Sequence, residues 1–249
     1  MTIEASWVQI SVPAAAGVTA TVMPGWWVLP EQPRGAVLVL PEVFGVNSWV
    51  RSVAERLAQE GYAALALSTF SRSAPDLDAG YDEAGLAAGR EHRDRVTAQQ
   101  LLADVQAAVA WIQQSHPSLG LGCVGFCFGG HLAMLAATNP VIAATCDFYG
   151  ARVSTFRPGA VEEATLSVVP AIAGHLWCFC GDQDPLMPAE ELQAIDQALR
   201  SADPSGRRHR FVRAAGAGHG YMCQARPDFH PEAAASGWNQ MLELFAEAL

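Results

Sequence analysis

A cysteine between glycines is the first candidate for chemistry in the sequence. Cys127 follows an apolar stretch, precedes another, and has a glycine two residues before it and two residues after it. This is the G-x-S-x-G nucleophile-elbow pattern with cysteine in the place of serine. At such a turn the sulfur lies at a helix N-terminus, which favours a thiolate and offers backbone N–H groups to an oxyanion. The pattern predicts a nucleophile; the alternative is a buried cysteine at a tight strand–helix turn.

A histidine and a carboxylate follow Cys127 in the order that such a nucleophile requires. The base must accept the thiol proton, and a carboxylate must orient the base. Asp184 and His219 each follow a predicted strand, and the order nucleophile, acid, histidine is that of α/β-hydrolases. Asp182 is the competing acid, and Asp184 has the alternative role of a carboxylate that caps the next helix. We expect a triad of Cys127, His219 and Asp184.

Glu42 and Val43 come directly after another predicted strand. We expect the backbone N–H groups of Val43 and Phe128 to form an oxyanion hole. Glu42 would then face the thiol of Cys127 and keep it neutral by charge repulsion until substrate arrives. The alternative is that Glu42 only caps the helix that begins near Asn47.

Buried strands alternate with helices along the chain. Apolar runs without alternation predict strands covered on both faces, as in a parallel sheet, at residues 36–40, 62–67, 121–126, 143–149, 176–180 and 208–212. Helical patterns occupy residues 48–60, 89–115, 130–138, 188–201 and 231–248. Residues 7–12 and 19–22 predict an antiparallel edge pair, and residues 154–174 predict a loop. We therefore expect a doubly wound α/β-hydrolase fold in which residues 1–249 form a single domain.

The composition argues against several classes of binding partner and cofactor. The formal net charge of −10 argues against nucleic-acid binding, and no apolar stretch reaches membrane-spanning length. The six cysteines form no C-x-x-C pair or repeated Cys/His spacing, so no metal is expected, and no glycine-rich loop implies a nucleotide cofactor. Without a signal-peptide pattern, we expect a cytoplasmic protein with free thiols, monomeric or a small homo-oligomer.

The sequence resembles the dienelactone hydrolase family, the carboxymethylenebutenolidase-like proteins, over nearly its whole length. The resemblance rests on residues 41–47, 61–62, 81–86, 125–130, 147–150, 184 and 216–221. It implies a Cys–His–Asp triad on the residues named above and a role for Glu42 in holding the resting thiol. Family members open an enol-lactone whose carboxylate is bound by arginines.

The same resemblance suggests which residues contact the substrate. Arg90 is the best match to one of the family's arginines, whereas the position four residues after His219 holds Cys223. Arg226 lies three residues further on and is the candidate to replace it, and Phe44 and Tyr149 belong to two of the matched motifs. We expect a hydrolase of small esters or lactones. The alternatives are the same chemistry on a thioester, a non-catalytic binding protein, or a thiol redox protein.

Overall fold

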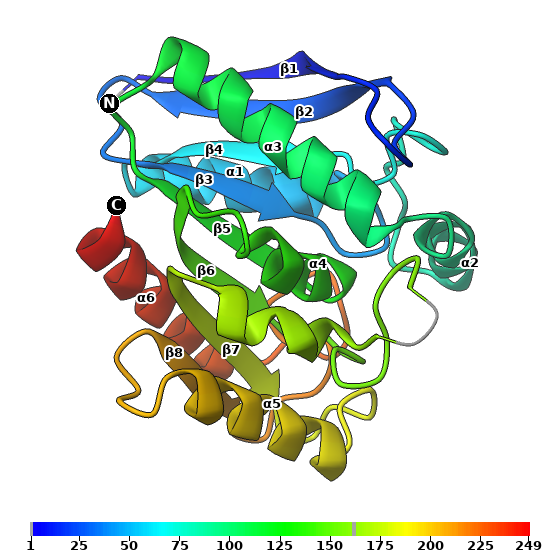
Figure 1. Ribbon diagram of the computed structural model, residues 1–249, viewed down its shortest axis with the longest axis vertical. Helices are drawn as coiled ribbons and strands as arrows, with labels where there is room; N and C mark the ends of the chain where they lie inside the picture. Colours follow the sequence, from blue (N-terminus) through cyan, green and yellow to red (C-terminus); the bar gives the residue numbers. More distant parts are fainter. Residues whose placement is uncertain (1, 161–162) are drawn as a thin grey trace.

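The computed structural model describes residues 2–160 and 163–249, and its strands form one twisted sheet (Figure 1). The strand order in these residues is β1 (Ile3–Val12), β2 (Thr21–Pro30), β4 (Ala63–Leu67), β3 (Ala36–Leu40), β5 (Leu121–Phe126), β6 (Ile142–Phe148), β7 (His175–Gly181) and β8 (His209–Ala214). The pairs β1–β2 and β2–β4 are antiparallel and the others are parallel. The expected α/β-hydrolase fold, a mostly parallel sheet with an antiparallel N-terminal edge, is confirmed.

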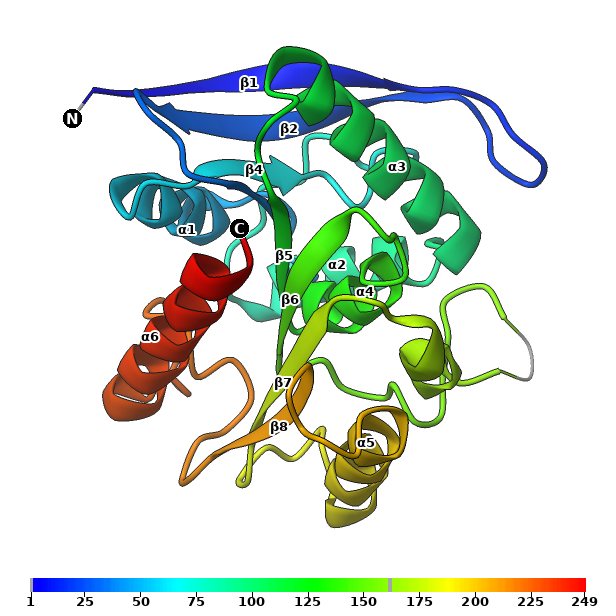
Figure 2. The same cartoon turned by 60° about the vertical axis from the view of Figure 1, so that its left-hand side comes forward.

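Helices cover both faces of the sheet, which explains the continuous apolar runs. Every residue of β3, β4 and β5 is buried, so neither face of these strands can be polar. Figure 2 shows one group of helices on one side, α1 (Ser48–Gln59) and α6 (Pro231–Ala248). The other side carries α3 (Ala98–Ser115), α4 (Phe128–Ala136) and α5 (Ala189–Ala202), while α2 (Glu83–Arg93) lies at the edge of the sheet (Figure 1).

Three sequence expectations were wrong in detail. Residues 89–115 are not one helix: α2 ends at Arg93 and α3 begins after Thr97, whose side chain accepts a hydrogen bond from the Gln100 backbone N–H at 3.1 Å. This N-cap outweighs the helical spacing that continues across the break. The second edge strand is ten residues long rather than four, because it pairs along all of β1. Residues 154–174 are not all loop, since Thr165–Ala171 form a 3-10 helix.

The carboxyl ends of the parallel strands bring the candidate residues to one edge of the sheet. The segment with Glu42 follows β3, Cys127 follows β5, and Tyr149 follows β6. Asp184 and His219 come after β7 and β8. This is the edge where open α/β sheets build their sites. In the described residues, no helix is both long and apolar enough to cross a membrane.

Candidate active site

Cys127 occupies a strained turn between β5 and α4. Its φ is 55° and its ψ is −117°, a left-handed backbone conformation that a residue with a side chain rarely adopts. The turn requires glycine on both sides: a Cβ on Gly125 would lie 1.9 Å from the Gly129 carbonyl oxygen, and one on Gly129 would lie 2.1 Å from the Leu40 carbonyl oxygen. The helix that follows begins at Phe128, two residues earlier than its sequence pattern predicted. The sulfur therefore lies at a helix N-terminus, partly exposed.

The structure brings the three expected triad side chains into one chain of contacts. His219 Nε2 lies 3.0 Å from Cys127 Sγ, and His219 Nδ1 lies 2.7 Å from Asp184 Oδ2. The other oxygen of Asp184 accepts a hydrogen bond from the Leu186 backbone N–H at 2.8 Å, which fixes the carboxylate. The competing acid, Asp182, instead accepts a hydrogen bond from the Gly216 backbone N–H at 2.8 Å. The geometry thus favours Asp184 as the partner of the histidine.

The electrostatics of the three groups favour a protonated histidine. Burial lowers the pKa of His219, but the charge of Cys127 and hydrogen bonds to Asp184 and Cys127 outweigh it and raise this pKa to about 10. An imidazolium that contacts the sulfur stabilises a thiolate, which is the reactive form of cysteine. The arrangement is that of a histidine that contacts the sulfur on one side and a buried carboxylate on the other.

The two residues expected to supply the oxyanion hole lie in the wall of one cavity. Val43 and Phe128 both line the cavity that contains Cys127. Phe128 is the first residue of α4, so its N–H has no partner within the helix. Neither N–H donates a hydrogen bond to another residue in the described part of the chain. Both donors thus remain available to an oxyanion.

Glu42 contacts an arginine that the sequence did not predict as its partner, while its other oxygen, Oε2, is buried with no hydrogen-bond partner in the described residues, so its expected role beside the thiol stays a prediction. Its Oε1 accepts a hydrogen bond from Arg226 Nη1 at 2.8 Å, and the Glu42 side chain is fully buried. A guanidinium is a strong partner for a carboxylate, so the ion pair holds this oxygen in place. The capping alternative is wrong, because Asn47 caps α1 with its own side chain.

The ion pair places Arg226, the candidate to replace the family's arginine at position 223, at the site. Arg226 lines the cavity beside Cys127, although it lies three residues beyond the expected place. Burial lowers its pKa, but the charges of Glu42 and Cys127 outweigh that effect and raise it. Cys223 is buried, and burial raises the pKa of its thiol to about 11. Arg226 thus supplies a cation to the cavity from a position three residues after Cys223.

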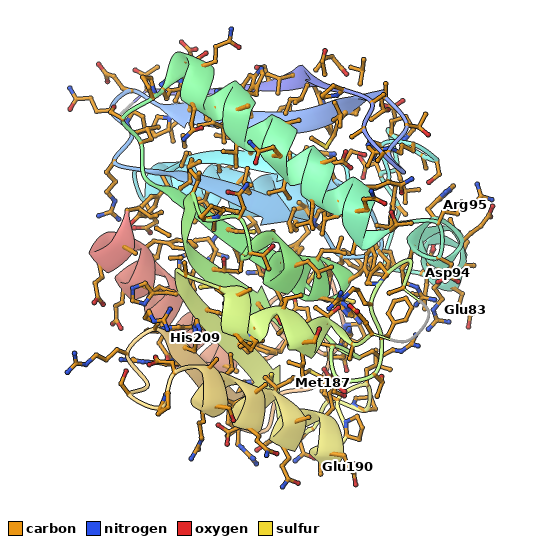
Figure 3. The ribbon with its side chains drawn as sticks, in the orientation of Figure 1. Glu83, Asp94, Arg95, Met187, Glu190 and His209 are labelled. Atoms are coloured by element: carbon orange, nitrogen blue, oxygen red, sulfur yellow. The ribbon has the colours of Figure 1, made fainter. Side chains whose placement is uncertain are left out.

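The cavity at this edge has two lobes that meet at Cys127 and His219. The first, the Arg226 lobe, has a volume of about 320 Å³, and the second, the Arg152 lobe, has a volume of about 370 Å³. Both lobes are lined by Val43, Arg90, Arg93, Cys127, Leu186 and His219. Figure 3 labels Glu83, which lies at the start of α2 and lines the Arg226 lobe, and Met187, which directly follows the lining residue Leu186.

The expected substrate contacts divide into those that line this cavity and one that does not. Arg90 lines both lobes, and Phe44 lines the Arg226 lobe, where its ring contacts Tyr81. Tyr149 is fully buried and lines neither lobe; its ring instead packs against His219, with centroids 5.3 Å apart. Tyr149 therefore packs against the histidine and does not line the cavity where a substrate would bind.

Two cavity arginines were not singled out from the sequence. Arg93 lies one helical turn after Arg90 on α2, and that i, i+3 spacing is a signal that places both on one face. Arg152 lies in the left-handed region, with φ of 66°, directly after the segment that contains Tyr149. Nothing in its local sequence pattern distinguishes it, because a single exposed arginine in a loop has no periodicity.

Comparison with known proteins identifies the family. The model of the dienelactone hydrolase family matches residues 23–249. The chain belongs to the dienelactone hydrolase family. A relative from Synechocystis sp. named "Putative carboxymethylenebutenolidase" is 37% identical over 216 residues, which cover 86% of each chain. The chain is accordingly a dienelactone hydrolase-like hydrolase.

Two further similarities agree with this family. A Bradyrhizobium protein named "Probable 2-oxo-3-(5-oxofuran-2-ylidene)propanoate lactonase" is 30% identical over 211 residues, covering 83% of this chain and 81% of that protein. The crystal structure of a putative dienelactone hydrolase from Klebsiella pneumoniae superposes with a TM-score of 0.83 at 26% identity, covering 99% of this chain and 100% of that one.

Proposed function

We propose that the protein hydrolyses small esters or lactones through a covalent acyl-enzyme on Cys127. The observation that carries this proposal is the continuous contact from sulfur to imidazole to carboxylate, 3.0 Å and 2.7 Å, at a nucleophile elbow. A buried structural cysteine would need neither a histidine on its sulfur nor a carboxylate behind that histidine. The names of the lactonase and carboxymethylenebutenolidase relatives point to the same bond type.

In the acylation step, the Cys127 thiolate attacks the substrate carbonyl carbon and forms a C–S bond. The carbonyl oxygen becomes an oxyanion, which the N–H groups of Val43 and Phe128 stabilise. When the intermediate collapses, the C–O bond to the leaving oxygen breaks, and the His219 imidazolium donates its proton to that oxygen. In a lactone the leaving oxygen stays attached through the ring, so the product remains part of the acyl-enzyme.

In the deacylation step, His219 is neutral and accepts a proton from a water molecule. The resulting hydroxide attacks the thioester carbon, and a second oxyanion occupies the same N–H groups. Collapse breaks the C–S bond, releases a carboxylic acid, and restores the thiolate–imidazolium pair. Asp184 keeps the imidazole in the tautomer that serves both steps.

A substrate panel tests this function and separates it from the alternatives. Wild-type protein is assayed with phenyl acetate, an enol-lactone and an acetyl thioester, with Cys127→Ala as the blank. We expect oxygen esters or the lactone to be hydrolysed by wild type and not by Cys127→Ala. Preference for the thioester would support a thioesterase with the same residues. Absence of turnover on all three, with retained alkylation of Cys127, would support the binding or redox alternatives and overturn the proposal.

A further inference from the structure

A buried carboxyl group outside the triad lies beside the nucleophile elbow. Asp147 is near the end of β6, is only 2% exposed, and is not one of the reacting groups. Its Oδ1 accepts a hydrogen bond from the Gly150 backbone N–H at 2.9 Å, which closes a turn over residues 147–150, the β6 turn. A buried carboxyl group is costly unless it is hydrogen-bonded, so this contact fixes the shape of the turn.

The β6 turn packs directly against the first turn of α4. A Cβ on Gly130 would lie 2.4 Å from Asp147 Oδ1 and 2.6 Å from the Phe148 carbonyl oxygen. A Cβ on Gly150 would lie 2.5 Å from the His131 backbone nitrogen. Only glycine permits such a close approach of two backbones. Because packed interiors transmit strain, a displacement of the β6 turn also displaces the start of the helix.

The β6 turn also anchors the nucleophile. The Cys127 backbone N–H donates a hydrogen bond to the Phe148 carbonyl oxygen at 2.9 Å, and Phe148 directly follows Asp147. Cys127 has a φ of 55°, a conformation that persists only where the surrounding contacts hold it. The hydrogen bond to Phe148 is one of these contacts, so the orientation of this carbonyl group affects where the sulfur lies.

The same turn carries the ring that packs on the histidine. Tyr149 has a φ of 46°, and its ring centroid lies 5.3 Å from that of His219. The Tyr149 backbone N–H donates a hydrogen bond to the Phe179 carbonyl oxygen at 2.9 Å, which ties this side of the turn to β7. Asp147 closes the other side through Gly150. One side-chain hydrogen bond therefore fixes a segment that contacts both the nucleophile and its base.

The acceptor oxygen of Asp147, rather than its charge, suits it to this role. Burial raises the pKa of Asp147 to about 7, although hydrogen bonds from Gly150 and Cys178 oppose that shift. The group is therefore only partly ionised near neutral pH, whereas one oxygen can accept the Gly150 N–H in either state. An asparagine supplies the same acceptor at the same distance from the backbone, and it should replace the aspartate.

We infer that Asp147 is a positioning residue for the reaction, because by closing the β6 turn it holds Cys127 and His219 in contact. This inference rests on the proposed function for the word reaction, but the contact of 3.0 Å between sulfur and imidazole exists without turnover. Asp147 lines neither lobe of the cavity, so its loss should lower kcat rather than substrate affinity. A misplacement of about 1 Å can cost on the order of 100-fold in rate.

Steady-state kinetics on 4-nitrophenyl acetate and alkylation of Cys127 by iodoacetamide test this role together. We expect Asp147→Ala to lower kcat by about tenfold to 100-fold, with KM changed by less than about threefold. Alkylation of Cys127 should slow at least about fivefold, because a sulfur that has lost its contact with His219 ionises less readily. Asp147→Asn keeps the acceptor and should return both values to within about threefold of wild type.

Asp203→Ala is the matched control. Asp203 is also a buried aspartate that accepts backbone N–H groups, from Arg208 at 2.6 Å and from His209 at 3.1 Å. It precedes β8 and so lies at the opposite edge of the sheet from the site. The control should lower the unfolding temperature, as Asp147→Ala does, and leave kcat and alkylation within about twofold of wild type. Equal losses of kcat in the two alanine variants would show a general effect of stability and overturn the inference.

The remaining outcomes also decide the inference. Wild-type kcat and alkylation in a folded Asp147→Ala variant, or an Asp147→Asn variant as impaired as Asp147→Ala, would overturn it. If Asp147→Ala does not fold, Asp147→Ser replaces it. The serine hydroxyl is one bond shorter and weakens the hydrogen bond to Gly150, so kcat should fall at least about threefold, and an unchanged kcat would overturn the inference. If wild type hydrolyses no ester, the proposed function fails, and the alkylation rates still decide whether Asp147 positions Cys127.

Discussion

The Asp184→Asn variant tests the histidine contact most precisely, because the structure fixes how the amide would lie. One oxygen of Asp184 accepts the Leu186 backbone N–H at 2.8 Å, and the other contacts His219 Nδ1 at 2.7 Å. An asparagine that keeps the first hydrogen bond turns its NH₂ group toward the imidazole. His219 Nδ1 must then accept, so its proton moves to Nε2, the nitrogen that has to serve as base.

The expected loss follows from that tautomer and from the lost charge. Removal of a charge-assisted hydrogen bond to a buried carboxylate costs about 1.5–3 kcal/mol, and the wrong tautomer raises the total to a loss of about 10³–10⁴ in kcat. At 1.36 kcal/mol per tenfold, this corresponds to about 4–5.5 kcal/mol in the activation barrier. The pKa of His219 should fall as well, because Asp184 is among the groups that raise it.

The assay is kcat and kcat/KM on 4-nitrophenyl acetate, with thermal unfolding as the check on folding. Asp182→Asn is the control: the residue lies two positions away and contacts the Gly216 backbone rather than His219. We expect less than a threefold change for that control. An Asp184→Asn enzyme that is folded and within tenfold of wild type would refute the reasoning, and a larger loss in Asp182→Asn would make Asp182 the acid.

Three further predictions concern single groups of the site. The pKa of His219 is raised to about 10, so its proton is present below that pH and lost above it. We therefore expect kcat/KM to decline only as pH rises through about 10. A decline centred near pH 6.5 would contradict this. Glu42→Gln leaves Arg226 without its carboxylate and should lower the free energy of unfolding by about 3 kcal/mol. Asp78→Asn breaks an exposed ion pair with Arg51 and should lower it by less than about 1 kcal/mol. Urea denaturation measures both, and equal losses would contradict this expectation. Arg90→Ala should raise KM for anionic esters at least about tenfold and leave neutral esters nearly unchanged, whereas equal steady-state losses on both would make Arg90 structural.

The sequence predicted the features that depend on local pattern. Continuous apolar runs identified the parallel strands, because strands covered on both faces have no polar positions. The glycines around Cys127 predicted the elbow, since only they fit the close approach of the Gly129 and Leu40 carbonyl oxygens. The chain order and strand-end positions of Asp184 and His219 placed them at the same edge.

What the sequence missed depends on tertiary contacts. Glu42 pairs with Arg226, which lies 184 residues away in the sequence, in the loop after β8. The break between α2 and α3 depends on one capping threonine, Thr97, within a segment whose helical spacing continues. Tyr149 lies in a motif that suggested a substrate contact, but its left-handed backbone, with φ of 46°, accompanies a buried ring that packs on His219.

Trapping the acyl-enzyme tests the central claim most directly. Wild-type protein is mixed with 4-nitrophenyl acetate, quenched in acid within the first turnover, and analysed by peptide mass spectrometry. The account predicts one acetyl group per chain, on the peptide that contains Cys127, and a Cys127→Ala variant that has lost at least about a thousandfold in kcat. An acetyl group on another residue during turnover, or a Cys127→Ala variant that retains more than about a thousandth of wild-type activity, would contradict it.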